Sequence, residues 1–211
     1  MATDMKVLLI NGSPRKSGCT YTALTEAAGA LNAEGVETEL LWLGAEEIQD
    51  CVACMGCAKS GACVIKGDAV ERLVEKASGS DGFIIGTPVY YAHPSGRVLS
   101  ALDRAFYSGK RYFEHKPAAA VASARRAGTT ASLDVLNKYF TIAQMPVVSS
   151  TYWNMVHGAG PEDVAKDLEG LQSMRNLGRN MAWLLKCIEL GAKAGIAAPE
   201  AEQEYRTNFI R

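Results

Sequence analysis

Short apolar runs alternate along the chain with longer segments in which apolar residues recur three and four positions apart. The first run, residues 7–10, ends at an Asn-Gly-Ser-Pro sequence, which predicts a strand buried on both faces and stopped by a turn. Further strands are predicted over residues 36–43, 83–86, 118–122 and 145–148. Helices are predicted over about residues 19–33, 70–77, 96–107 and 129–143. A loop is predicted over residues 87–95.

Strand, loop and helix units that repeat in this order predict a parallel sheet with helices on both faces, joined by right-handed crossovers. The predicted fold is a doubly wound α/β domain with five parallel strands. After Pro161 the helical spacing continues as far as Ile188, which predicts one long C-terminal helix. We expect one domain over residues 1–198 and a mostly polar tail over 199–211, whose apolar anchor is residues 209–210.

Composition narrows the function classes. The 211 residues are 48% hydrophobic and 21% charged, which is typical of a globular protein and excludes a disordered or low-complexity chain. A net charge of -1 offers no basic excess for nucleic acid or an anionic membrane surface, so we expect a small-molecule ligand. Because no long apolar segment or signal-like leader is seen, a cytoplasmic location is expected.

The loop after the first predicted strand combines hydroxyls, glycine and one guanidinium at the start of a helix. Backbone N–H groups and the helix dipole favour a phosphate at such a position, against the alternative of an ordinary turn. An ATP-binding loop would need Lys directly after Gly18, and the dinucleotide pattern G-x-G-x-x-G is missing. The thiol of Cys19 is expected to pack in the loop rather than act as a nucleophile. The expected anion-binding residues are Ser13, Arg15, Ser17, Gly18, Cys19 and Thr20.

Four cysteines lie within thirteen residues in the pattern C-x2-C-x2-C-x5-C, formed by Cys51, Cys54, Cys57 and Cys63. A disulfide framework is not expected in a reducing cytoplasm, so metal or redox chemistry is favoured. The spacing is close to the opening of bacterial ferredoxin motifs and favours a 4Fe-4S cluster. Zinc bound by four thiolates and a metal-free packing loop remain the alternatives. Cys187, on the C-terminal helix, is expected in the core.

Four segments together resemble the flavodoxin-like NAD(P)H-dependent FMN reductases, over roughly residues 5–158. They are residues 12–20, residues 87–91 with Gly96, residues 124–130, and the cysteine segment 51–63, which resembles the compact motif of iron-sulfur flavoproteins. The resemblance implies a flavodoxin-like strand order, with the FMN phosphate on the first loop. It also implies that two further loops flank the flavin ring, through Pro88, Val89, Tyr90, Tyr91, Ala92, Gly96, Arg125, Arg126 and Gly128.

The same resemblance implies an FMN-dependent oxidoreductase that passes electrons from NAD(P)H to a flavin, a quinone or another small acceptor. Because hydride chemistry belongs to the cofactor, no side chain is expected to be catalytic. The alternative is an iron-sulfur electron carrier reduced by ferredoxin, and a non-enzymatic redox sensor is a third possibility. The long terminal helix and the need to shelter a flavin edge predict a homodimer or a higher homo-oligomer.

Overall fold

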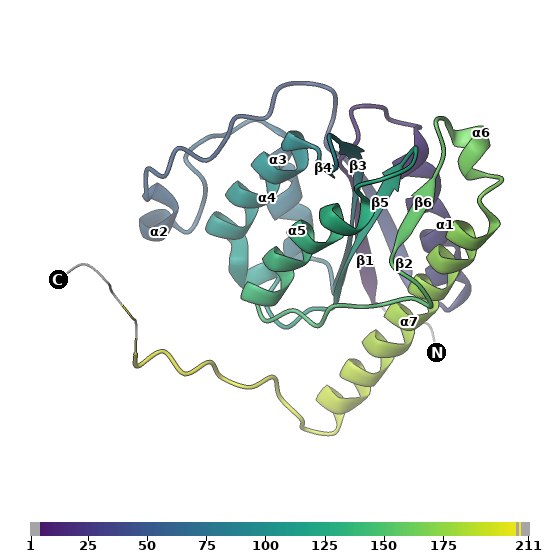
Figure 1. Ribbon diagram of the computed structural model, residues 1–211. Helices are drawn as coiled ribbons and strands as arrows, with labels where there is room; N and C mark the ends of the chain where they lie inside the picture. The colour runs from purple at the N-terminus through teal and green to yellow at the C-terminus, as the bar shows by residue number, and fades with distance from the viewer. Residues whose placement is uncertain (1–4, 206, 208–211) are drawn as a thin grey trace.

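Five parallel strands form the centre of the molecule in the computed structural model, which describes residues 5–205 and residue 207. They are β1 (Lys6–Asn11), β2 (Glu37–Trp42), β3 (Gly82–Tyr90), β5 (Ala118–Ala124) and β6 (Met155–His157). Their order across the sheet is β2-β1-β3-β5-β6 (Figure 1). Counted as parallel strands this is 2-1-3-4-5, the flavodoxin-like order, so the predicted fold class is confirmed.

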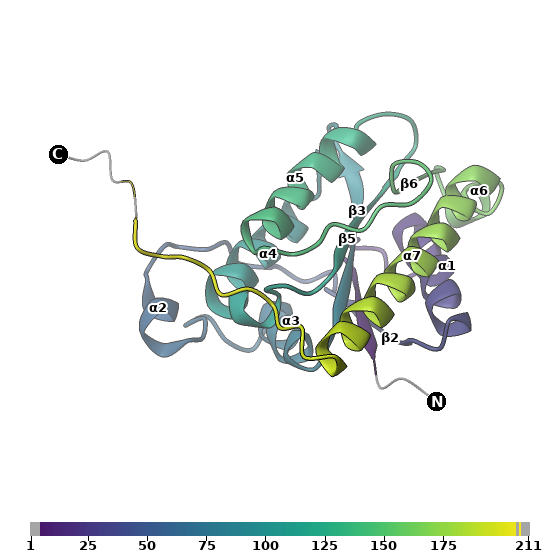
Figure 2. The same cartoon turned by 90° about the horizontal axis from the view of Figure 1, so that it is seen from below.

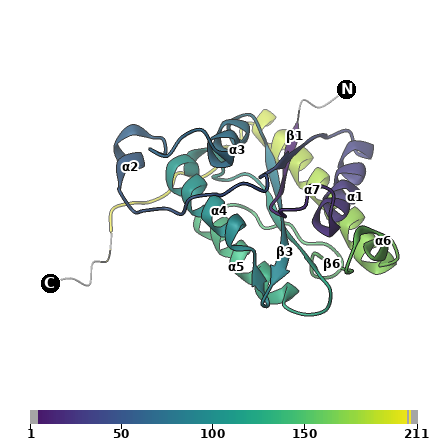
Figure 3. The same ribbon diagram turned by 90° about the horizontal axis from the view of Figure 1, so that it is seen from above.

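Helices cover both faces of the sheet (Figures 1 and 2). One face carries α1 (Cys19–Ala33), α6 (Pro161–Val164) and α7 (Leu168–Lys193). The other carries α3 (Ala69–Ser78), α4 (Gly96–Gly109) and α5 (Thr129–Ile142). A one-turn helix, α2 (Gly56–Ser60), lies beside α3 and α4 and away from α1 and α6 (Figure 3). The sheet is therefore enclosed on both sides, with the cysteine segment projecting at one end.

Strand β1 shows why the first apolar run is buried on both faces. Leu8 and Ile10 pack into the core under α3, α4 and α5. Val7 and Leu9 alternate with them and pack into the core under α1 and α7. Successive side chains of a strand point to opposite faces, so only an uninterrupted apolar run satisfies two helix layers at once.

Several helix bounds follow directly from the sequence. Helix α1 begins and ends where it was predicted, at residues 19 and 33. Asp68 caps α3, because its Oδ1 accepts hydrogen bonds from the backbone N–H of Val70 at 3.0 Å and of Glu71 at 3.3 Å.

No helix among the described residues is both long and apolar enough to span a membrane.

The strand predicted over residues 145–148 is wrong. That segment makes a single bridge, between Val147 and Ala118 at the start of β5, and then leaves the sheet. The fifth strand is β6, whose pairing begins opposite Ala122. Met145 and Val148 are nevertheless buried, so the run is apolar because it packs on the core and not because it pairs as a strand.

The loop predicted over residues 87–95 is also wrong in part. Strand β3 continues to Tyr90 and pairs in antiparallel fashion with β4 (His93–Pro94). The turn between them places Tyr91 at φ 49° and Ala92 at φ 60°. Hairpins with two left-handed residues usually carry Asn or Gly there, so nothing in Tyr-Ala signals one.

The C-terminal region differs from prediction in two respects. The single helix expected after Pro161 is divided into α6 and α7, because Asp167 caps α7 by accepting a hydrogen bond from the Gly170 N–H at 2.9 Å. Cys187 is exposed on α7 and does not lie in the core. Over residues 196–203 the chain runs without helix or strand (Figure 1). Residues 209–210 lie outside the described residues, and the domain boundary at residue 198 stays a prediction.

Candidate functional site

The first candidate site is the loop between β1 and α1, which is organised by Asn11. The Asn11 Nδ2 donates to the carbonyl of Lys16 at 3.0 Å, and its Oδ1 accepts from the backbone N–H of Ser13 at 3.0 Å. The Ser13 hydroxyl oxygen in turn accepts from the N–H of Arg15 at 3.1 Å. One buried amide therefore closes the loop and orients the backbone of residues 13–16.

Neighbouring strands hold this loop from outside. The Gly12 N–H donates to the Gly86 carbonyl at 2.9 Å, and the Ser95 hydroxyl donates to the Gly12 carbonyl at 3.3 Å. The indole N–H of Trp42, at the end of β2, donates to the Ser13 carbonyl at 2.8 Å. A Cβ at Gly12 would lie 1.9 Å from Val98 Cγ2, so the close approach of loop and α4 requires glycine.

The start of α1 is open to a ligand. Gly18 is its N-cap, and no side chain among the described residues caps the helix there. Such a helix start presents backbone N–H groups and a positive dipole end. Arg15 and Ser17 are exposed beside it, and Arg15 forms no ion pair with any described residue. The geometry suits a phosphate-sized anion.

Thr20 and Cys19, two of the residues expected at the anion, have side chains that are hydrogen-bonded within the protein. The Thr20 hydroxyl is buried and hydrogen-bonds the Ser123 hydroxyl at 2.8 Å, which ties α1 to β5. The Cys19 thiol donates to the Gly158 carbonyl at 3.7 Å, and burial raises its pKa. A thiol with a raised pKa stays protonated near neutral pH, so Cys19 is a packing thiol, as the sequence predicts.

The two other predicted loops meet beside the first. A Cβ at Gly128 would lie 2.3 Å from Ala92 Cα and 2.9 Å from Val89 Cγ1, so the hairpin and the loop after β5 are in direct contact. Tyr90 and Tyr91 are exposed on the hairpin, while Pro88 and Val89 are half-buried. Gly96, Arg125 and Arg126 are also exposed, and neither arginine forms an ion pair within the described chain. All three loops thus converge at the carboxyl edge of the sheet.

The sequence interpretation missed the residues that hold these loops together. Asn11 is predicted in the turn after the first strand and Trp42 in the second strand, and neither is predicted to hold a loop, although each is the last residue of its strand. Ser95 and Thr87 were assigned to a plain loop, yet the Ser95 N–H donates to Thr87 Oγ1 at 3.1 Å. A polar or aromatic residue at the carboxyl end of a buried strand was the available signal, because that edge is where ligands bind.

The second candidate site is a cavity of about 370 Å³ that all four clustered cysteines line. Cys54 is exposed and the other three are half-buried. Apolar side chains of the same segment and polar residues of α4 complete the wall. The lining comprises Cys51, Val52, Ala53, Cys54, Met55, Cys57, Cys63, Val64, Ile65, Asp103, Arg104, Tyr107 and Ser108.

The cysteine segment is wound tightly around this cavity. Ala53 and Met55 have φ values of 51° and 57°, and left-handed non-glycine residues of this kind cluster at ligand clamps. A Cβ at Gly56 would lie 2.5 Å from Val64 Cγ1 and 3.6 Å from Cys54 Sγ. The loop closes on itself so closely that a side chain at residue 56 would displace the Val64 side chain.

Four thiols are the donor set that an iron-sulfur cluster takes, and all four line this cavity. Within residues 5–205 and 207, no three His, Cys, Asp or Glu side chains converge closely enough to hold one metal ion. A zinc site needs all four thiolates about 2.3 Å from one point. Iron-sulfur clusters are held by four thiolates around a larger inorganic core, which matches four thiols around one cavity.

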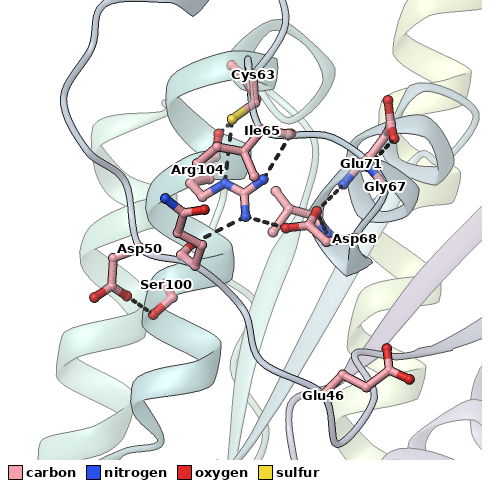
Figure 4. Close-up of polar contacts among 12 residues, drawn as sticks. Glu46, Asp50, Cys63, Ile65, Gly67, Asp68, Glu71, Ser100 and Arg104 are labelled. Atoms are coloured by element: carbon pink, nitrogen blue, oxygen red, sulfur yellow. Dashed lines mark hydrogen bonds and ion pairs between the residues drawn. The ribbon is translucent and has the colours of Figure 1, made fainter.

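Arg104 anchors the cysteine segment to α4 (Figure 4). Its guanidinium pairs with Asp68 and donates to the carbonyls of Gln49 at 3.2 Å and Ile65 at 3.1 Å. Its Nε donates to Cys63 Sγ at 3.5 Å. The Arg104 side chain is only 1% exposed, so these contacts satisfy a fully buried cation.

Asp68 gives this anchor a pH dependence. Burial opposes its ionisation, but the hydrogen bond and charge of Arg104 and two backbone N–H donors outweigh burial and hold its pKa below the ordinary value. A depressed folded-state pKa adds stability above the unfolded pKa of about 3.9, and this stability is lost as the pH falls through the folded pKa. We expect the free energy of unfolding of Asp68→Asn to fall less steeply than that of the wild type below about pH 5.

Urea unfolding at several pH values measures this effect. Asp134→Asn, at an exposed carboxylate of α5, is the matched control, and its free energy of unfolding at pH 7 should stay within about 0.5 kcal/mol of the wild type. Equal acid sensitivity of Asp68→Asn and the wild type would contradict the assigned role of the ion pair.

Sheet order and loop positions place the molecule among flavodoxin-like α/β proteins. More specifically, the chain belongs to the NADPH-dependent FMN reductase family, whose family model matches residues 5–160. The resemblance inferred from the sequence motifs is therefore confirmed.

Two proteins of known name are similar to this chain in sequence, and one solved structure is similar to it in fold. An iron-sulfur flavoprotein of Methanocaldococcus jannaschii is 33% identical over 193 residues, which cover 88% of this chain and 100% of the relative. An NAD(P)H-dependent FMN reductase of Pseudomonas aeruginosa is 34% identical over 131 residues, covering 61% of this chain and 65% of the relative. The crystal structure of RosB with bound 8-demethyl-8-formylriboflavin-5'-phosphate superposes with a TM-score of 0.68 at 16% identity, covering 98% and 92% of the two chains. This last likeness shows the fold alone.

Proposed function

We propose that this protein is an FMN-dependent oxidoreductase whose flavin lies at the carboxyl edge of the sheet. The observation that carries the proposal is the convergence of three loops beside the uncapped start of α1. Membership of the FMN reductase family supports it, and so does the riboflavin phosphate named for the similarly folded RosB.

The residues have distinct roles in this proposal. The phosphate is held by backbone N–H groups of the first loop, with Arg15 and Ser17 adding charge and a hydroxyl. The hairpin at Tyr90 and Tyr91 and the loop at Gly128 orient the ring and limit access of water. Bound FMN supplies hydride and electron transfer, while the chain supplies binding and orientation and no catalytic side chain.

We also propose that Cys51, Cys54, Cys57 and Cys63 hold a 4Fe-4S cluster. The shared cavity and the tight loop support it, as does the name iron-sulfur flavoprotein carried by the relative from Methanocaldococcus jannaschii. A cluster accepts single electrons, so the protein would connect two-electron and one-electron partners.

NAD(P)H is the proposed electron donor to the flavin. Exposed Arg125 and Arg126, without ion pairs in the described chain, offer two cations for nucleotide phosphates beside the ring site. The terminal acceptor in this proposal is a flavin, a quinone or another small molecule. Reduced ferredoxin is the second candidate donor, and the cysteine cavity favours it because a cluster suits one-electron exchange.

Anaerobic reduction tests the donor. Protein reconstituted with FMN, ferrous iron and sulfide is mixed with NADPH, with NADH, or with reduced ferredoxin, and the oxidised flavin band is followed. Rapid bleaching by either nicotinamide supports the reductase, and turnover with a quinone excludes a mere sensor. Bleaching by ferredoxin alone overturns NAD(P)H as donor and leaves the electron carrier. A protein that fails to quench FMN fluorescence in a titration overturns the whole proposal.

We further propose a homodimer or a higher homo-oligomer in the cytoplasm. Helix α7 exposes Trp183, Ile188 and Leu190, which is apolar surface suited to a second copy. Six cysteines without a disulfide are consistent with a reducing compartment. Sedimentation at micromolar concentration should find an assembly larger than one chain, and a monomer would contradict it.

A further inference from the structure

Arg104 is the largest side chain that is fully buried among the described residues, and its contacts are concentrated on one region. It reaches from the middle of α4 to Gln49, Cys63, Ile65 and Asp68, all in or next to the cysteine segment (Figure 4). Burying a guanidinium is costly unless its donors are satisfied. The buried guanidinium of Arg104 lies at the wall of the cysteine cavity, where these contacts offset the free-energy cost of its burial.

Holding the loop does not require all of these contacts. The Asp68 carboxylate and the two carbonyls already anchor the guanidinium to both sides of the loop. The Nε–H, in contrast, points at Cys63 Sγ at 3.5 Å, one of the four sulfurs that line the cavity. The same segment has a second arginine anchor, because exposed Arg111 donates to the Gly61 carbonyl at 3.1 Å, and its other hydrogen bonds among the described residues go to Ser108 and Tyr112.

We propose that Arg104 is a positioning residue that donates its Nε–H and its positive charge to the Cys63 thiolate and thereby raises the reduction potential of the cluster. This inference rests on the proposed cluster. Thiolate ligands carry more negative charge when a cluster takes up an electron, and hydrogen bonds and net charge around the sulfurs set the potential. Asp68 opposes the effect by offsetting part of the guanidinium charge.

This role predicts opposite effects for the two partners. Arg104→Gln removes the cation and leaves Asp68 near the cavity, so the equilibrium constant for one-electron reduction should fall about tenfold, which is about 59 mV. Asp68→Asn removes the carboxylate that offsets the Arg104 charge, so the equilibrium constant for one-electron reduction should rise. The Asn side chain keeps an acceptor for Arg104 and remains a good N-cap, so this variant should fold. If Arg104 and Asp68 only held the loop in place, both substitutions would shift the reduction potential of the cluster in the same direction.

Two further variants complete the series. Arg104→Lys keeps the charge and most of the stem but loses the planar donor group, so its constant should lie between those of Arg104→Gln and the wild type. Arg111→Gln is the matched control for loop anchoring, and its potential should equal that of the wild type. If Arg104→Gln does not fold, the opposite shifts of Arg104→Lys and Asp68→Asn carry the test.

The experiment reconstitutes each variant anaerobically with FMN, ferrous iron and sulfide, and then titrates the cluster electrochemically while following its spectrum. Opposite shifts of the Arg104 and Asp68 variants support the inference. Shifts in one direction, or none, overturn it while the proposed cluster stands. A wild-type protein that binds FMN but takes up no iron overturns both the inference and the cluster, and leaves the flavin site intact.

Discussion

Replacing Gly12 with alanine is expected to weaken FMN binding by at least a hundredfold, about 2.7 kcal/mol. The added methyl group would lie 1.9 Å from Val98 Cγ2 and 2.9 Å from the Gly86 carbonyl oxygen. Val98 is fully buried, and the Gly86 carbonyl already accepts the Gly12 N–H, so the loop itself must move. We also expect the free energy of unfolding to fall by about 1–3 kcal/mol from overpacking.

Fluorescence-quenching titration with FMN and urea unfolding measure the two effects. Gly29→Ala is the matched control, because a Cβ at this position of α1 would meet no described atom within 4 Å besides its chain neighbours and the nearby backbone of its own helix. Alanine within a helix should raise the free energy of unfolding by about 0.5–1 kcal/mol and leave FMN binding unchanged. Wild-type FMN affinity in Gly12→Ala would show that the flavin phosphate is not held by this loop.

The fold could be predicted wherever burial alone determines the pattern. An uninterrupted apolar run such as that of β1 fits few structures besides a strand covered on both faces, and the helical spacing of residues 19–33 predicts α1 with its observed bounds. The pattern could not separate Met145 and Val148, which are buried without pairing, from a true strand. Nor could it predict the hairpin, because Tyr91 and Ala92 adopt left-handed turns that other parts of the fold impose.

The sequence predicts which segments form the two candidate sites, but less well which atoms hydrogen-bond to one another there. The first loop and the four cysteines were recognised from residue type and spacing, and the other two loops from the family resemblance. The Thr20 hydroxyl, expected at the ligand, is bonded to Ser123. That partner lies on a strand 103 residues away and depends on sheet register, which the loop sequence does not contain. The burial of Arg104 has a signal in the sequence, because Arg104 follows Ala101 by three positions and so lies on the buried face of α4.

Replacing Cys57 with serine is expected to remove the bound iron while leaving the FMN in place. Cys57 lies at the start of α2 and lines the same cavity as the other three clustered cysteines, so the cluster would lose one of its four ligands. Iron-sulfur clusters select soft thiolates, and a serine hydroxyl is a hard and weakly acidic substitute. Reconstituted wild type should hold about four iron atoms per chain, and the variant less than about one.

Metal analysis decides between the three interpretations of the cysteine segment, because each leaves a different composition. Cys187→Ser is the matched control, since this exposed cysteine of α7 does not line the cavity and its loss should leave the iron content unchanged. One zinc ion per wild-type chain, lost in Cys57→Ser, would favour a structural zinc site. Four reactive thiols without iron or zinc would favour a packing loop, and electrons would then leave only through the flavin.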